Sequence, residues 1–187
     1  MAKSPKNLIP FPRQAIQARI PKETNMTREI DKEAVSVELI ADRLTEAGYE
    51  VETDPDENII IVHRTWVNLR LQLYPDLKSI RFRSYVWLNR HLTEEDLLKL
   101  LRELNDDVYL PKFTSYRWDD GDLALFASYS VFYTFGLNMP NLIFSMRRFI
   151  ETKQGVYQDY IKGTAYDYVK EKPPEAVEET QGEGNSE

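Results

Sequence analysis

The feature that most constrains the fold is a pair of segments that alternate apolar and polar residues about a short turn. Residues 66–74, WVNLRLQLY, and residues 79–88, SIRFRSYVWL, flank the turn PDLK. This period of two is typical of strands with one buried face. Pairing the segments about the turn places Leu71 opposite Phe82 and Val67 opposite Val86. A slip of one residue would bury arginine, so the sequence predicts a hairpin in this register.

The same register determines the other face of the hairpin. It places Gln72 opposite Arg81, Arg70 opposite Arg83, Asn68 opposite Tyr85 and Trp66 opposite Trp87. Like charges directly opposite each other on a sheet are destabilising. We therefore expect an anionic group to lie between or over Arg70 and Arg83.

The preceding segment, NIIIVH at residues 58–63, adds apolar residues to that outer face. A short turn at residues 64–65 puts Ile60 and Val62 in the core, and Ile59 and Ile61 outside. A strand that is apolar on both faces is usually covered on both. We predict a partner-binding surface composed of Ile59, Ile61, Trp66, Arg70, Arg81, Arg83, Tyr85 and Trp87.

The remaining segments predict helices and strands in an α+β order. Helices are expected at 37–47, capped by Ser36, from Thr93 to about Asn105, and from near Pro140. Further strands are expected at 49–53 and on both sides of the turn at Asp120 and Gly121. Short turns between strands indicate an antiparallel sheet, here packed with three helices.

Trp118 has two possible positions beside that turn. A two-residue loop pairs Trp118 with Leu123 and sends the tryptophan into the core. A three-residue loop with a bulge pairs it with Asp122 and sends it outward. The sequence leaves both open.

Charge divides the chain of 187 residues into three parts. Residues 1–32 carry a net charge of +4 and are expected to be an extended basic arm. Residues 33–170 are expected to form the α+β domain. Residues 171–187 carry a net charge of −5 and are expected to be a disordered acidic tail, because they contain too little apolar surface to fold.

Three segments carry a family resemblance: SVELIADRLTEAGYEVE at 36–52, LLRELND at 100–106, and KFTSYRWDDGDLALFASYSVFYTFG at 112–136. They resemble the YbjN-domain family of bacterial proteins over roughly residues 35–155. The resemblance implies the fold of type III secretion chaperones, which are typically dimeric protein-binding modules. It also implies a loose association with sensory regulation, and it offers no catalytic residues.

Candidate catalytic and metal-binding residues are few. The chain has no cysteine, which excludes disulfides and thiol chemistry, and its two histidines, His63 and His91, lack metal-ligand spacing. Asp119, Asp120 and Asp122 do not have the spacing of a calcium loop. No glycine-rich phosphate loop is present. We therefore expect no enzyme, no cofactor and no metal site.

The length and position of the apolar runs bear on the cellular location of the protein and on its association with membranes. The longest apolar runs, such as 58–62, are too short to span a bilayer, and the N-terminal residues lack the apolar core of a secretory signal. We expect a cytoplasmic protein that does not bind a membrane.

Three interpretations of the outer face remain open. The last helix or the segment LIPFP at 8–12 covers it, a protein client or second subunit binds it, or single-stranded nucleic acid binds it. The pI of about 5.0 and the acidic tail argue against nucleic acid. The sequence therefore favours a non-catalytic, chaperone- or adaptor-like interaction module that forms a homodimer. The alternative is a nucleic-acid-binding regulator that uses the basic arm and the Trp/Arg face.

Overall fold

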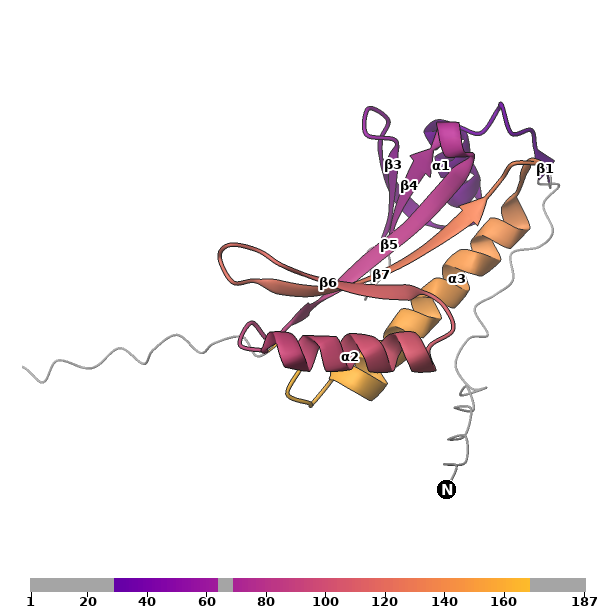
Figure 1. Cartoon of the computed structure of the whole chain (residues 1–187). Coiled ribbons are helices and arrows are strands. Elements are labelled where there is room, and N and C mark those ends of the chain that lie inside the picture. The colour runs from indigo at the N-terminus through magenta and orange to yellow at the C-terminus, as the bar shows by residue number, and fades with distance from the viewer. Residues whose placement is uncertain (1–28, 64–68, 169–187) are drawn as a thin grey trace, which may run out of the picture.

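The computed structural model describes residues 29–63 and 69–168 and has a mixed α+β architecture (Figure 1). Its main sheet has six strands in the order β2-β3-β4-β5-β7-β6, and every neighbouring pair is antiparallel. The strands are β2 (Glu50–Asp54), β3 (Ile59–His63), β4 (Leu69–Tyr74), β5 (Ser79–Leu88), β6 (Lys112–Arg117) and β7 (Leu123–Phe132). A small second sheet pairs β1 (Glu29–Ile30) with β8 (Leu137–Asn138). The predicted α+β class is confirmed.

The α-helices of the described residues are α1 (Val37–Glu46), α2 (Glu94–Asp107) and α3 (Met139–Val156). Their starts follow the predicted capping chemistry. The Ser36 hydroxyl accepts a hydrogen bond from the Leu39 backbone N–H at 3.2 Å, and Thr93 and Asp96 form a reciprocal capping box at α2. Gly48 ends α1 with a φ of +83°, a backbone conformation that side chains disfavour.

The predicted hairpin register is confirmed where the structure describes it. Arg70 lies opposite Arg83, Leu71 opposite Phe82, and Gln72 opposite Arg81. The turn between the strands is a 3-10 helix, η1 (Pro75–Leu77). The predicted pairs that involve residues 66–68 lie outside the described residues.

One face of the sheet, here called the inner face, carries the core. All three helices bury their apolar sides against this face, with α1 packed on β2 and β3, α2 beside β6, and α3 along β7 (Figure 1). The core cluster includes Leu44 from α1, Leu104 from α2 and Phe149 from α3. From the strands it includes Ile60, Val62, Leu71, Phe82, Phe113 and Leu125.

The two longest strands, β5 and β7, are neighbours in the sheet. They pair over ten residues, from Ser79 with Phe132 to Leu88 with Leu123. The strand that comes between them in sequence, β6, lies instead at the edge of the sheet, beyond β7. Because of this order, side chains from β7 and β6 share the sheet face that carries the arginines of β5.

The interior also contains a charged side chain, Lys153 on α3. It is buried, and its ammonium donates hydrogen bonds to the Ser84 hydroxyl at 2.7 Å and to the Tyr85 carbonyl oxygen at 2.6 Å. Among the described residues, no carboxylate lies within ion-pair distance of this ammonium. Burial lowers the pKa of Lys153 to about 8.

The expected arm and tail lie mostly outside the described residues. Strand β1 falls within the segment 1–32 and pairs with β8, so the described structure begins inside the expected arm. Residues 1–28 and 169–187 are not described. The expected domain limits at 33 and 170 therefore stay predictions.

Candidate partner-binding surface

The second face of the sheet, here called the outer face, carries no helix among the described residues. Its side chains come from all six strands, and residues paired across neighbouring strands share the face. They include Arg70, Gln72, Arg81, Arg83, Tyr85, Trp87, Thr114, Tyr116, Phe126 and Ser128. Most of these side chains are partly or largely exposed.

Five rings form a continuous aromatic cluster on and beside this face: Tyr85, Trp87, Tyr116, Trp118 and Phe126. The ring centroid of Trp87 lies 5.2 Å from that of Tyr85 and 5.4 Å from that of Trp118. Trp118 in turn lies 4.8 Å from Tyr116. These are the distances of favourable aromatic pairs, so the rings hold one another in place.

Trp118 takes the outward position of the two that the sequence allowed. Its backbone N–H donates to the Asp122 carbonyl oxygen at 2.9 Å, and the Gly121 N–H donates to the Trp118 carbonyl oxygen at 3.0 Å. Gly121 has a φ of +89°, as a bulged three-residue loop requires. The turn thus places Trp118 in the aromatic cluster on the outer face rather than in the core.

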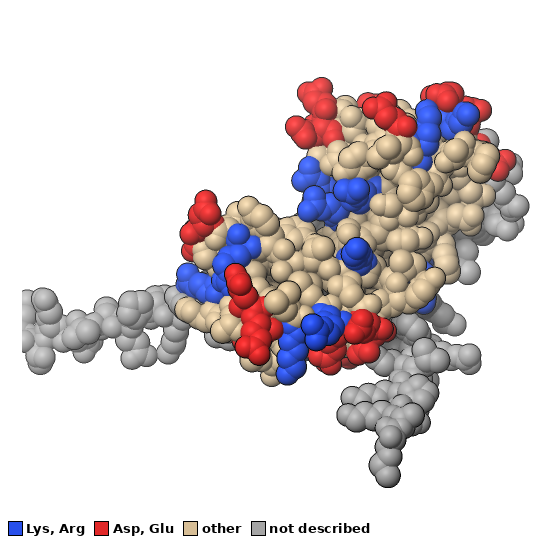
Figure 2. Space-filling view, in the orientation of Figure 1, with Lys and Arg blue, Asp and Glu red and all other residues tan. Residues whose placement is uncertain are grey.

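Three exposed arginines, here called the arginine group, lie beside the aromatic cluster: Arg70, Arg81 and Arg83. The Arg81 guanidinium lies 4.9 Å from the ring centroid of Tyr74, and that of Arg83 lies 5.2 Å from the ring centroid of Phe126. In the described part of the chain, no carboxylate lies within ion-pair distance of the three. Figure 2 shows basic side chains gathered over this part of the sheet and acidic ones nearer its rims.

The eight residues predicted for the surface differ in accessibility. Tyr85 is 47% exposed and Trp87 40%, and the arginine group is exposed. Ile59 lies on the outer face, opposite Gln72, but is only 3% exposed, and Ile61 is partly buried. Trp66 lies outside the described residues. The accessible described part of the predicted set therefore consists of residues from β4 and β5.

Sequence reasoning missed Tyr116 and Phe126 and left Trp118 undecided. Their place in the cluster depends on the pairing of β5 with β7, which are separated by α2 and β6. The segment 123–132 is apolar at positions of both parities, so its alternation does not reveal which residues face outward. The aromatic content of residues 116–126 was the available signal.

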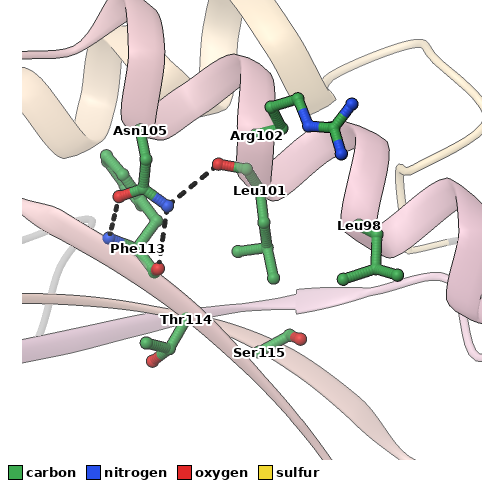
Figure 3. Close-up of a pocket in the computed structure, with 7 residues that line it drawn as sticks. All are labelled: Leu98, Leu101, Arg102, Asn105, Phe113, Thr114 and Ser115. Atoms are coloured by element: carbon green, nitrogen blue, oxygen red, sulfur yellow. Dashed lines mark hydrogen bonds between the residues drawn. The ribbon is translucent and has the colours of Figure 1, made fainter.

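A shallow groove lies between α2 and the edge strand β6 (Figure 3). It is lined by Leu98, Leu101, Arg102, Asn105, Phe113, Thr114 and Ser115. The Asn105 side chain donates to the carbonyl oxygens of Leu101 and Phe113, at 2.9 and 3.1 Å, and accepts from the Phe113 N–H at 2.9 Å. It thereby satisfies the backbone of an edge residue that has no strand partner on that side.

The change Asn105→Ala is expected to destabilise the fold by about 1–2 kcal/mol, because it removes three hydrogen bonds and leaves the Phe113 backbone without its protein partner. Chemical denaturation measures this loss. Arg102→Ala is the matched control, since Arg102 is exposed in the same helix, and we expect a change within about 0.5 kcal/mol. Equal effects of the two changes would contradict a structural role for Asn105.

Residues 29–63 and 69–168 contain no group of three or more His, Asp or Glu side chains placed to hold a metal ion. No helix in these ranges has the length and apolarity needed to cross a membrane.

An antiparallel sheet with helices on one face and aromatic and arginine side chains on the other defines a mixed α+β domain in which no described helix covers the second sheet face. The chain belongs to the YbjN family, whose sequence model matches residues 36–160 and is described as "Putative bacterial sensory transduction regulator". The family description is thus that of a regulator.

A solved structure supports the same fold. The chain is similar to "Crystal structure of YbjN, a putative transcription regulator from E. coli", with a TM-score of 0.53 and 15% sequence identity. The alignment covers 65% of this chain and 88% of that one. No curated protein matches the chain. The expected likeness to type III secretion chaperones stays a prediction.

Proposed function

We propose that this chain is a non-catalytic protein-interaction module, chaperone- or adaptor-like, that binds a protein client or second subunit on the outer face of its sheet. The supporting observation is the combination of the aromatic cluster with the arginine group on a face that no described helix covers. Aromatic residues and arginine are the types enriched at the centres of protein interfaces. The regulator description of the family fits a module that acts through a partner.

Single-stranded nucleic acid is the second candidate. Exposed rings beside arginines on an open sheet are how such strands are stacked and neutralised. The net charge of −7 argues against it. Affinity capture with the full chain, with and without nuclease, separates the two candidates. A partner protein that stays bound after nuclease treatment supports the proposal, and partners lost with nuclease support the second candidate.

The reversal Arg70→Glu is expected to leave stability unchanged or slightly higher, because it replaces a repulsive pair with Arg83 by an attractive one. Binding of the captured protein should weaken by roughly 1.5–3 kcal/mol, the scale for losing a charge-assisted contact. A thermal melt and a titration on the same variant measure both quantities.

Lys99→Glu, a charge reversal on the exposed side of α2, is the control for net charge and should bind like the wild type. If Arg70→Glu instead unfolds more easily and binds the partner normally, the arginines act within the chain and the proposal fails.

Self-association is a further expectation, most simply as a homodimer, because a sheet face that carries clustered aromatic rings and no described helix is suited to a second copy. Light scattering across a concentration series measures the mass. A mass that doubles toward high micromolar concentration supports a dimer, whereas a constant monomer mass would shift the proposal to a client protein alone.

A further inference from the structure

The arginine group lacks an acidic partner among the described residues, although like charges placed this close together favour an anionic neighbour. Arg70 and Arg83 lie directly opposite each other, and Arg81 is one pair further along the same face. The contacts recorded for Arg81 and Arg83 are with the rings of Tyr74 and Phe126, and Arg81 also reaches the Tyr74 hydroxyl at 3.4 Å. Rings orient guanidinium groups without neutralising them.

The described chain ends at one end of this face. Asp167 forms an antiparallel bridge with Leu88, the last residue of β5, and the Asn89 N–H donates to the Tyr166 carbonyl oxygen at 3.1 Å. Tyr168 is the last described residue, so the described chain stops beside the end of β5 that carries Trp87. From Leu88 to Arg83 is five residues along a strand, or roughly 17 Å.

The chain that follows has the right charge and enough length. Residues 171–187 contain six glutamates and one lysine. Seven residues after Tyr168, an extended chain has spanned up to about 24 Å, which brings Glu175 within reach of Arg83. Glu178 and Glu179 follow with length to spare. The other undescribed terminus, residues 1–28, is net basic and has the wrong sign for this role.

We propose that the acidic tail, residues 171–187, binds the arginine group of its own chain and competes there with the external partner. Glutamate carboxylates neutralise the guanidinium groups, while the aromatic cluster stays available for apolar side chains. A tether of this length holds the tail at an effective concentration in the millimolar range, so even a weak contact is populated. The competition rests on the proposed function, and it identifies the partner as a protein with an acidic segment.

A spin label tests the contact directly. Because the chain has no cysteine, Ala176→Cys provides a single attachment site in the full-length protein. We expect the label to broaden the NMR signals of Arg81, Arg83 and Ser128 on the outer face, but not those of exposed α2 residues such as Lys99. The broadening should be lost in the variant Glu175→Gln, Glu178→Gln, Glu179→Gln and at high salt. An outer face without broadening, or broadening that ignores the glutamates and the salt, would overturn the proposal.

Two further arms complete the test. A mixture of labelled, NMR-silent chains with isotope-enriched, unlabelled chains reports only contact between chains. Broadening as strong in this mixture as in the labelled, enriched protein would overturn the intrachain assignment. A synthetic peptide of residues 171–187 then serves as the probe ligand. It should bind the glutamine variant at least about threefold more tightly than the wild type, because the internal competitor is weakened. Equal affinities would overturn the competition.

The outcome is independent of the capture experiment. Broadening of the outer face by the tail label, with no captured protein, would sink the proposed function and the competition but leave the tail contact standing. A captured protein with no tail broadening would sink this inference alone.

Discussion

Replacing Lys153 by methionine is expected to abolish a rise in stability that the wild-type protein shows between about pH 8 and pH 10. In the folded protein, burial lowers the pKa of Lys153 to about 8 from its ordinary value of 10.5. Between these values the unfolded chain binds a proton that the folded chain has released, so the free energy of unfolding rises with pH. The rise should be about 1–2 kcal/mol, and below pH 8 both states are protonated and the slope disappears.

Ionisation of tyrosines ends this rise in stability at its high-pH limit. Burial raises the pKa of Tyr133 and of Tyr160, so above about pH 10 their ionisation in the unfolded chain lowers stability again. Denaturation midpoints from pH 7 to pH 10 measure the rise. Lys162→Met, which removes an exposed lysine directly after the π-helical turn (Tyr157–Ile161) that follows α3, should keep the rise. A Lys153→Met variant that still gains stability over this range would show that another group titrates.

Two substitutions of Lys153, by methionine and by glutamate, should have strongly different effects on the free energy of unfolding at pH 7. Methionine fills the same space without a buried charge, so Lys153→Met should be at least as stable as the wild type. Glutamate would place a carboxylate against the Tyr85 carbonyl oxygen, and Lys153→Glu should lose about 3–5 kcal/mol. The Lys153 ammonium contacts the backbone of Tyr85, whose ring belongs to the aromatic cluster. Retained partner binding in Lys153→Met would therefore show that the lysine is not needed to position that ring.

The second large effect is expected for Trp87→Ala. Trp87 links Tyr85 and Trp118 at the middle of the aromatic cluster and is 40% exposed, as anchor residues at interfaces are before binding. Its removal should weaken binding of the partner protein by about 2–4 kcal/mol, or roughly 30- to 1000-fold. The loss of stability should be smaller, about 1 kcal/mol, because much of the ring is already in contact with water.

Isothermal titration of wild-type and variant chains measures the binding change, with circular dichroism as the check on folding. Phe135→Ala is the matched control, because Phe135 is an aromatic residue that is 99% exposed and lies beyond the end of β7. Equal affinities of Trp87→Ala and the wild type would exclude the cluster from the interface.

Local chemistry made much of the fold predictable. The capping residues Ser36 and Thr93 specify helix starts because each accepts a hydrogen bond from the backbone N–H three residues further along the chain. The alternation in β4 and β5 specifies a register because an error of one residue would bury Arg70 or Arg83. Both signals depend on residues close in sequence, and both predictions were confirmed.

The pairs that were not predictable are distant in sequence. The pairing of β5 with β7 joins segments that are separated in sequence by α2 and β6, so no single turn specifies it. Trp118 depended on whether Gly121 formed a bulge, which the sequence alone left open. The burial of Ile59 on the outer face also lies beyond what alternation can indicate.

The most direct test of the central claim is affinity capture from nuclease-treated extracts with three full-length chains, followed by quantification of the captured proteins. The three chains are the wild type, a face variant with Arg83→Ala and Trp87→Ala, and the control Phe135→Ala, each first shown to be folded. The account predicts a partner protein that is captured equally by the wild type and the control and is depleted at least tenfold by the face variant. Capture of the same proteins, in the same amounts, by all three chains would contradict it.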